Sequence, residues 1–251
     1  MANYCECLYH KCMAPVFIII PTYNERGNLE TLVKKIAGAG IPDFKIIVVD
    51  DNSPDGTGRI AEKLAENYPL RVLHRTEKFG LGTAYVHAFK KILSGAFDDW
   101  GCPEFIIQMD ADLSHDPKDI LRMLAKARDC DLVLGSRYVP GGKIENWGIG
   151  RRLLSRFGNV YARMILNLPY CDLTGGFKCF KRHVLQNLDL DLLSSVGYNF
   201  QIETTYRARQ KGYKICEIPI TFTERKIGKS KIDLGIIIES FWKVLLLRFF
   251  S

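Results

Sequence analysis

Two aspartates, Asp110 and Asp112, follow a short apolar run and are separated only by Ala111. The run Phe105–Met109 predicts a buried strand, so both carboxylates fall at a strand terminus, where their oxygens can share one divalent cation. Mg²⁺ or Mn²⁺ held in this way keeps coordination positions open for substrate phosphates. Many such tripeptides are solvated loop acids, but the position at a strand end in a basic protein favours a metal site.

A second acidic pair, Asp50 and Asp51, ends the apolar run Lys45–Val49 and is followed by turn-forming residues. Turns and helix capping explain part of this segment. In doubly wound sheets a carboxylate at this place also accepts hydrogen bonds from a base or ribose. Residues 21–25 end the first apolar run, and Tyr23 within them can stack on a base.

Signatures of several other classes are missing from the sequence. It contains no phosphate-binding loop of the G-x-x-x-x-G-K-[ST] type, no dinucleotide fingerprint after a strand and no G-x-S-x-G nucleophile motif. The five histidines show no metal-site spacing, and His115, the one beside a motif, is interpreted as packing or polar support.

The charge of the chain points to anionic partners. Its 35 basic and 28 acidic residues leave a net charge of +7, which favours nucleotides, phosphorylated substrates, phospholipid head groups or nucleic acid. Residues 137–163 hold six basic residues against one acid, and residues 225–251 hold six against two. A solvated basic face is the alternative for either run. With 47% hydrophobic and 25% charged residues, the composition excludes a mainly disordered, collagen-like or coiled-coil chain.

The eight cysteines give an expectation about the compartment. The last five have no regular spacing, and Met1–Met13 lacks the apolar core of a secretory signal. We therefore expect reduced cysteines in a cytosol-facing protein. The N-terminal cluster of Cys5, Cys7, His10 and Cys12 could offer zinc ligands, but its spacing favours a flexible segment over residues 1–13.

The elements that must hold these residues alternate along the first half of the chain. Apolar runs predict strands, and helical spacing predicts helices between them: strands at Val16–Ile20, Lys45–Val49, Arg71–His74, Phe105–Met109 and Leu132–Leu134, and helices at Asn24–Ala37, Thr57–Glu66, Gly82–Leu93 and Pro117–Ala127. This alternation predicts an α/β fold with an open, mostly parallel sheet and helices on both faces. Ligands then bind beyond the carboxyl ends of the strands, where the acidic clusters lie.

The rhythm changes after Gly135. An amphipathic helix at Leu153–Leu168 is predicted to pack on the sheet, followed by a turn and strand at 172–180, a helix at 198–210 and a strand at 214–222. We expect one domain over residues 14–225 and a C-terminal tail over 226–251. In Ile232–Ser251 no uncharged run exceeds five residues, which argues against a membrane-spanning helix. We expect instead an amphipathic helix that lies in a membrane interface, or that docks on the core or on a membrane partner.

Taken together, the motifs resemble the family 2 glycosyltransferases of the GT-A, Rossmann-like fold, and within them the dolichyl-phosphate mannosyltransferases. The segments that carry the resemblance occur in the family's order and span nearly the whole chain: PTYNERGNL (21–29), VVDDNSPDGT (48–57), KFGLGTAYVHAF (78–89), MDADLSHDP (109–117), GSRY (135–138), RRLLSRFGN (151–159), DLTGGFKCF (172–180), GYNFQIE (197–203) and EIPITFTERKIGKSK (217–231).

The resemblance implies an inverting transfer of mannose from GDP-mannose to dolichyl phosphate, which yields dolichyl phosphate mannose for glycoconjugate synthesis. It also implies Mg²⁺ or Mn²⁺ as cofactor and no nucleic-acid partner. The short chain resembles catalytic subunits that bind small membrane-spanning partner subunits and lie on the cytoplasmic face of the endoplasmic reticulum membrane. Two alternatives stay open: a polyprenyl-phosphate glucosyltransferase that uses UDP-glucose, and a non-catalytic subunit that binds a nucleotide sugar.

The resemblance also assigns roles to individual residues. The nucleotide sugar is expected to contact Pro21, Tyr23, Glu25, Val49, Asp50, Asp51, Asp110, Ala111, Asp112, Lys178, Arg225 and Lys231. The metal is expected on Asp110 and Asp112, the acceptor phosphate on Arg137, Arg151 and Ser155, and catalysis on Asp112, Arg137, Arg151, Ser155 and Arg225. Some members of the family carry Gln two residues after the second metal aspartate, where this chain has Ser114.

Elementary chemistry agrees with such a reaction. A phosphate monoester has a second pKa of about 6 to 7, by analogy with phosphoserine, so the acceptor is largely a dianion at neutral pH and requires no general base. The reaction does require cations that bring the acceptor phosphate beside the diphosphate of the nucleotide sugar. Arg137, Arg151, Arg225 and Lys231 can supply these cations.

Overall fold

The computed structural model describes residues 14–193, 197–224 and 234–250. The expected roles of Arg225 and Lys231, and the N-terminal cysteine cluster, therefore lie outside the described residues. The elements in chain order are β1 (Val16–Thr22), α1 (Leu29–Ala37), β2 (Phe44–Asp50), α2 (Thr57–Ala65), β3 (Leu70–His74), α3 (Leu81–Leu93), η1 (Asp98–Trp100), β4 (Phe105–Gln108), α4 (Asp119–Ala127), β5 (Leu132–Ser136), β6 (Lys143–Glu145), α5 (Ile149–Leu166), β7 (Lys178–Lys181), α6 (Arg182–Asn187), η2 (Leu190–Leu192), α7 (Tyr198–Gln210), β8 (Ile215–Pro219), β9 (Thr221–Thr223) and α8 (Leu234–Phe250).

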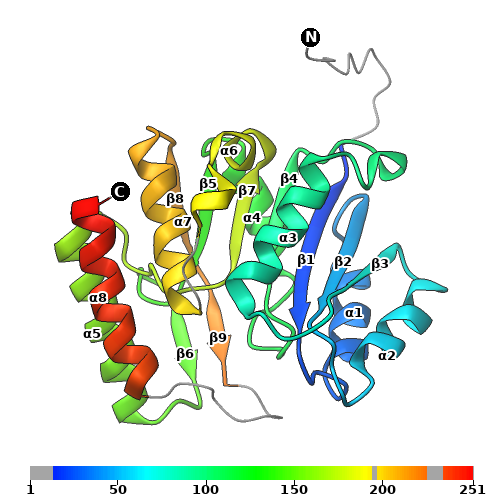
Figure 1. Cartoon of the computed structure of the whole chain (residues 1–251), viewed down its shortest axis with the longest axis horizontal. Coiled ribbons are helices and arrows are strands. Elements are labelled where there is room, and N and C mark those ends of the chain that lie inside the picture. The colour runs from blue at the N-terminus through cyan, green and yellow to red at the C-terminus, as the bar shows by residue number, and fades with distance from the viewer. Residues whose placement is uncertain (1–13, 194–196, 225–233, 251) are drawn as a thin grey trace.

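A seven-stranded sheet forms the centre of the molecule, in the order β3-β2-β1-β4-β7-β5-β8 (Figure 1). All neighbouring strands are parallel except β7, which is antiparallel to both β4 and β5. The predicted α/β fold with a mostly parallel sheet is thus confirmed. The described residues also form a separate parallel pair, β6 with β9.

Both faces of the sheet are buried, which explains why the strands read as continuous apolar runs. In β1, Phe17 and Ile19 point into one core together with α3, α5, α6, α7 and α8, whereas Ile18 and Ile20 point into the other with α1, α2 and α4. The parallel strands β1, β2 and β4 end at the same edge, the lower one in Figure 1, and their ends carry the acidic clusters.

The strand predicted over 214–222 is divided in the structure. Its first part, β8, pairs with β5 and ends at Pro219, and its second part, β9, pairs with β6. Proline has no backbone N–H, so it cannot donate to the ladder, and the chain leaves the large sheet at this residue. This exit carries Phe222 away from the large sheet and toward His115 and Trp147.

Helix α5, predicted over Leu153–Leu168 to pack on the sheet, contributes Ala162 and Leu166 to the core on one face of the sheet. Its buried residues are Asn159, Ala162 and Leu166. A stripe of apolar side chains at helical spacing faces away from the protein: Ile149, Leu153, Phe157, Val160 and Met164 are 43–78% exposed. We refer to these five residues as the α5 stripe.

Helix α8 lies beside α5 and α7 at the end of the molecule beyond β8 (Figure 1). Val244 and Leu247 are buried in the core, whereas Trp242, Leu246 and Phe249 are exposed, so the helix is apolar on both sides. In the described parts of the chain, no helix combines the length and the apolarity that crossing a membrane requires.

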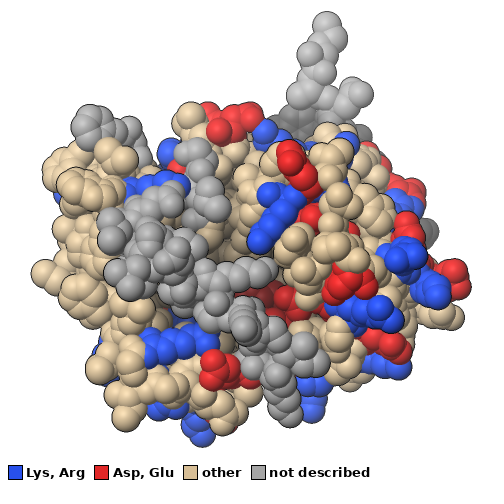
Figure 2. Space-filling view, turned by 60° about the horizontal axis from the view of Figure 1, so that its bottom comes forward, with Lys and Arg blue, Asp and Glu red and all other residues tan. Residues whose placement is uncertain are grey.

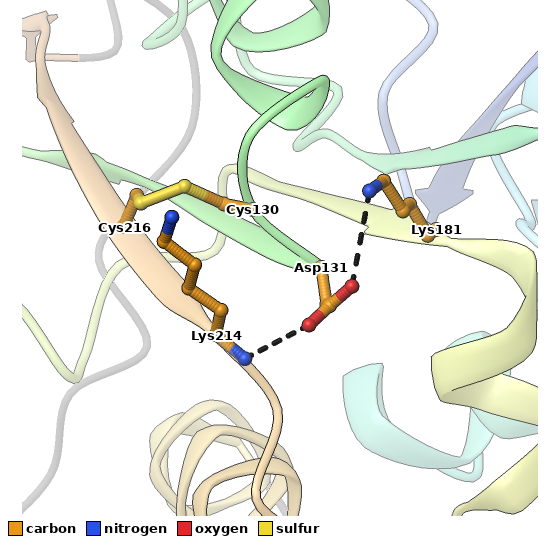
Figure 3. The surroundings of a disulfide bond; sticks show 5 residues. All are labelled: Cys130, Asp131, Lys181, Lys214 and Cys216. Carbon is orange, nitrogen blue, oxygen red and sulfur yellow. Dashed lines mark hydrogen bonds and ion pairs between the residues drawn. A yellow bond between two sulfur atoms is a disulfide. The ribbon is translucent and has the colours of Figure 1, made fainter.

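A disulfide joins Cys130, which precedes β5, to Cys216 in β8 (Figure 3). Beside it Asp131 accepts a hydrogen bond from the backbone amide of Lys214 and lies 3.8 Å from the ammonium of Lys181. The expectation that the cysteines are reduced is therefore wrong for this pair. Among the described cysteines, Cys102, Cys171 and Cys179 are free.

Candidate active site

Hydrogen bonds tie together the loops that follow β1 and β2. The backbone amide of Asn24 donates to the hydroxyl of Ser53 at 3.1 Å, and the amide of Glu25 donates to the hydroxyl of Thr57 at 2.9 Å. Asn24 and Asn52 both adopt positive φ angles, which Asn tolerates better than most residues. The expected nucleotide residues Pro21, Tyr23 and Glu25 thus lie beside the second acidic cluster, each partly exposed.

The two aspartates after β2 have different surroundings. Asp50 is buried and accepts hydrogen bonds from the hydroxyls of Thr22 and Ser53, so it holds the two loops together. Val49, the residue before it, is fully buried in the strand. Asp51 turns the other way and pairs with Arg75 at 2.7 Å. Burial raises the pKa of Asp51 above its usual value, although Arg75 opposes this effect.

Residues 75–83 lie against Asp50 and Asp51. The sequence motifs assign no role to the charged residues of this segment. Arg75 also donates to the hydroxyl of Thr83 and lies 4.9 Å from the ring of Phe79. The ammonium of Lys78 lies 4.4 Å from the ring of Tyr23. The segment therefore contacts both Asp51 and Tyr23 at the ends of β1 and β2.

Asp110 and Asp112 follow β4 at the same edge of the sheet, and both are partly exposed, while Ala111 between them is buried. Leu113 adopts a φ of 63°, which turns the chain so that the amide of Ser114 donates to Asp112 at 3.1 Å. Ser114 itself is buried. Figure 2 looks onto this end of the molecule and shows acidic side chains in a hollow near its middle.

The donor set at this loop fits a hard divalent cation that is shared with a ligand. Within residues 14–193, 197–224 and 234–250, no three His, Cys, Asp or Glu side chains are placed to hold a metal by themselves. Mg²⁺ and Mn²⁺ commonly use one or two carboxylates and complete their shell with phosphate oxygens and water. Asp110 and Asp112 suit such a site, since Gly176 packs against the first of them without a side chain in between.

His115 is buried under the loop of Asp110 and Asp112 and packs against it. It is stacked on Phe177 with ring centroids 4.8 Å apart, and its Nδ1 accepts a hydrogen bond from the amide of Asp110 at 3.4 Å. Burial lowers the pKa of His115 to about 4. This placement agrees with the interpretation of His115 as packing and polar support.

Arg137, which follows β5, is a buried cation with a dedicated partner. It donates to Asp172 from its backbone amide at 2.9 Å and from two guanidinium nitrogens at 2.7 Å each. Burial alone would raise the pKa of Asp172, but Arg137 outweighs it and holds that pKa below its usual value. Asp172 lies in one of the recognised segments, yet no feature of the sequence pairs it with Arg137.

Arg151 and Ser155 lie one turn apart on α5 and face the same region. Arg151 donates to Glu224 at 2.6 Å and lies 4.0 Å from the ring of Trp147, which is buried. Ser155 accepts a hydrogen bond from the hydroxyl of Tyr138 at 2.7 Å. The motifs assign no role to either of these partners: Trp147 lies outside the recognised segments, and Glu224 lies within the segment 217–231.

Aromatic contacts connect the loop after β4, which holds Asp110, Asp112 and His115, to the cations Arg137 and Arg151. Phe222 of β9 lies 5.3 Å from His115 and 5.4 Å from Trp147, between ring centroids. The guanidinium of Arg137 lies 5.3 Å from Phe222 and 5.5 Å from Trp147. A series of contacts thus links Arg137 and Arg151, expected for the acceptor phosphate, through Trp147 and Phe222 to His115, which accepts from the amide of Asp110.

Lys178 is not among the residues that the structure brings to this place. It is fully buried in β7, and its ammonium donates to the carbonyl of Gln201 and to the hydroxyls of Thr204 and Thr205. Burial holds the pKa of Lys178 well below its usual value. Its contacts lie under α7 rather than at the edge of the sheet.

Comparison with known proteins adds a family and relatives. The model of the family described as "Glycosyl transferase family 2" matches residues 17–189. The chain is 45% identical over 233 residues to the polyprenol monophosphomannose synthase of Mycolicibacterium smegmatis, which covers 90% of this chain and 84% of the relative. It is 43% identical over 226 residues to the undecaprenyl-phosphate mannosyltransferase of Micrococcus luteus, which covers 90% of each chain.

Solved structures share the fold. Glucosyl-3-phosphoglycerate synthase from Mycobacterium tuberculosis, with Mn²⁺, UDP and glucosyl-3-phosphoglycerate bound, matches with a TM-score of 0.65 at 18% identity, over 94% of this chain and 80% of that one. A mannosyltransferase from Pyrobaculum calidifontis, in complex with GDP-Man and Mn²⁺, matches with a TM-score of 0.60 at 18% identity, over 92% of this chain and 69% of that one.

Proposed function

We infer the function of this chain from one premise, that it belongs to the family 2 glycosyltransferases. We propose that it transfers mannose from GDP-mannose to a polyprenyl phosphate, with dolichyl phosphate as the specific acceptor, and that the anomeric carbon is inverted. The observation that carries the proposal is the series of ring contacts that connects Arg137 and Arg151, through Trp147 and Phe222, to His115 in the loop of Asp110 and Asp112. The polyprenol and undecaprenyl relatives support the same acceptor class.

The side chains divide the work between two anions. Asp110 and Asp112 would hold Mg²⁺ or Mn²⁺ on the diphosphate, and the bound cation would neutralise charge that develops on the leaving nucleotide. Arg137 and Arg151 attract the acceptor phosphate, and Asp172 keeps the first of these guanidiniums oriented. The acceptor dianion attacks without a general base, so no side chain needs to remove a proton.

We propose further that the protein works as a peripheral protein on the cytoplasmic face of the endoplasmic reticulum membrane, alone or with small membrane-spanning subunits. The lipid chain of the acceptor stays in the bilayer, so the site must reach its surface. Positions 151 and 155 lie about 160–200° around the helix from Leu153, at about 100° per residue. Helix α5 thus presents Arg151 and Ser155 to the site and the α5 stripe to the outside. Because Cys130 and Cys216 form a disulfide, reduced cysteines no longer support a cytosol-facing protein. The proposed location therefore rests on the lipid substrate.

A transfer assay tests the reaction. Purified protein is incubated with GDP-mannose, GDP-glucose, UDP-glucose or UDP-mannose, with Mg²⁺ or Mn²⁺, and with dolichyl or undecaprenyl phosphate. We expect a mannosyl lipid from GDP-mannose, faster with the dolichyl acceptor, and none when a chelator is in excess. A glucosyl lipid from UDP-glucose as the main product would replace our proposal by the glucosyltransferase alternative. Nucleotide-sugar binding without transfer to either lipid would leave only a binding role.

Vesicle flotation tests the membrane surface. We expect the wild-type protein to float with vesicles of phosphatidylcholine and phosphatidylserine, and Leu153→Glu with Phe157→Glu to remain in the soluble fraction. Leu121→Glu, on the half-exposed side of α4, is the control, because it adds one negative charge, against two in the double variant, at another apolar surface position. Equal flotation of all three proteins would contradict the role of the α5 stripe.

A further inference from the structure

A layer of polar side chains lies under the metal loop, between the sheet and helices α3 and α7. Gln108 of β4 and Lys178 of β7 are register partners, and both are fully buried on the face of the sheet that carries Phe180. Tyr85 of α3 and Gln201 of α7 are buried in the same region. Polar groups this deep normally have partners, because an unsatisfied buried group destabilises the fold.

Two observations single out Tyr85 in this layer. Its ring is stacked on Phe200 with centroids 5.8 Å apart and on Phe89 at 6.2 Å, so the position of the hydroxyl is fixed by the core. That hydroxyl is buried and lies beside the carboxylate of Asp110. Burial, and then the charges of Asp110 and Asp112, raise the pKa of Tyr85 well above its usual value.

The other side of the same carboxylate is also closely packed. A side chain at Gly176 would begin 3.2 Å from each oxygen of Asp110, so only glycine leaves the carboxylate undisturbed. The backbone amide of Asp110 is directed toward His115. The aspartate therefore sits between the backbone at Gly176 and the phenol of Tyr85, with little freedom to rotate.

We propose that Tyr85 is a positioning residue for the metal site: its hydroxyl donates to one oxygen of Asp110 and thereby turns the other oxygen toward the cation. The inference rests on the metal assignment made under the proposed function. A phenol is protonated at neutral pH, so beside a carboxylate it acts as a hydrogen-bond donor. Groups that orient a metal-binding side chain in this manner typically change metal affinity by 10- to 100-fold.

Tyr85→Phe tests this inference, since it removes only the hydroxyl and keeps the stacked ring. Mn²⁺ binding in the presence of GDP is measured by the electron paramagnetic resonance signal of the free ion. We expect the variant to bind Mn²⁺ about tenfold more weakly than the wild type. The Mn²⁺ concentration for half-maximal transfer should rise by the same factor, while the rate at saturating Mn²⁺ stays near that of the wild type.

The controls separate a positioning role from simple packing. Tyr206→Phe removes a hydroxyl from another buried tyrosine of the same core and should leave Mn²⁺ affinity unchanged. If Tyr85 only fills the core, removal of its hydroxyl is neutral or stabilising and does not move Mn²⁺ affinity. Unchanged affinity in Tyr85→Phe, with Asp110→Asn strongly weakened, overturns the inference and leaves the metal site standing. A wild-type protein that binds Mn²⁺ no better than Asp110→Asn overturns the metal site and the inference together.

Discussion

The two sides of the site are built from contacts of different range. On the proposed donor side, the loops after β1, β2, β3 and β4, parallel strands bring their ends together, and Asp51 meets Arg75 only 24 residues away. On the acceptor side, β5 to β9 with α5, Arg151 meets Glu224 across 73 residues, and the disulfide spans 86. The donor side therefore follows from the repeating strand–helix unit, whereas the acceptor side depends on how distant segments pack.

This difference predicts which side fails when one residue changes. Donor-side carboxylates at strand ends can lose their chemistry while the sheet persists. The residues of the proposed acceptor side also hold distant segments together, so their replacement should affect stability as well as binding. The predictions below test this contrast.

The largest expected effect is on the donor side, at Asp112. Asp112→Asn should lower transfer by about a thousandfold, since a divalent cation on the diphosphate supplies several kcal/mol. Its unfolding midpoint in urea should match that of the wild type, because the carboxylate is partly exposed at a strand end. Asp129→Asn, an exposed acid after α4, is the control and should keep full activity. Full transfer by the Asp112 variant contradicts the metal assignment.

Asp172→Asn should have the opposite signature on the acceptor side. It leaves the buried guanidinium of Arg137 without its counter-charge, so we expect the free energy of unfolding to fall by about 3–5 kcal/mol. Urea denaturation measures this loss. The double variant Arg137→Met with Asp172→Leu removes both charges and should be less destabilised than Asp172→Asn alone. A double variant that is the less stable of the two would show that packing, not charge, makes this pair important.

The disulfide should contribute less than the buried ion pair. Cys216→Ala opens the 86-residue loop between β5 and β8, and we expect the free energy of unfolding to fall by about 2–4 kcal/mol. Reduction of the wild type with dithiothreitol should give the same shift. Cys102→Ala, at an exposed free cysteine, controls for the substitution itself. A wild-type midpoint that is insensitive to the reductant would contradict a stabilising disulfide.

How much the sequence could predict follows the same division. The parallel strands were predictable because both sheet faces are covered, which makes each strand a continuous apolar run such as Val16–Ile20. The loop of Asp110 and Asp112 was predictable because a strand end fixes its location. The pairing of Arg137 with Asp172 was not, since nothing local selects one partner among many distant acids.

Two further residues show why family motifs do not fix geometry. Lys178 stands in a recognised segment, but it shares a strand face with Phe180, and that face is covered by α7. Alternation in a doubly covered strand was the signal that could have placed it in the core. The helix at Leu153–Leu168 was expected to pack on the sheet, but helical spacing alone does not tell which side of a helix finds a partner, and Leu153 is exposed.

Arg151→Ala tests acceptor binding with an intermediate effect. A charge-assisted hydrogen bond contributes about 1.5–3 kcal/mol, so the KM for the polyprenyl phosphate should rise by roughly 10- to 100-fold. GDP affinity, measured by calorimetry, should stay unchanged, because Arg151 lies on the acceptor side. Arg156→Ala, at an exposed position on the same helix, is the matched control. Loss of GDP binding with an unchanged acceptor KM would reverse our assignment of the two sides.

Ser155→Ala should give the smallest effect and tells how Ser155 acts. The variant removes the hydrogen bond from Tyr138, which typically contributes about 0.5–1.5 kcal/mol, so the acceptor KM should rise by roughly 2- to 13-fold. Tyr138→Phe removes the same bond from the other partner. If the bond alone matters, both single variants and the double variant share one KM, because the second change has nothing left to remove. A larger effect of Ser155→Ala than of Tyr138→Phe indicates that the serine hydroxyl touches the acceptor phosphate itself. Equal KM values for the wild type and Ser155→Ala would remove Ser155 from the acceptor side and leave Arg137 and Arg151 as its binding residues.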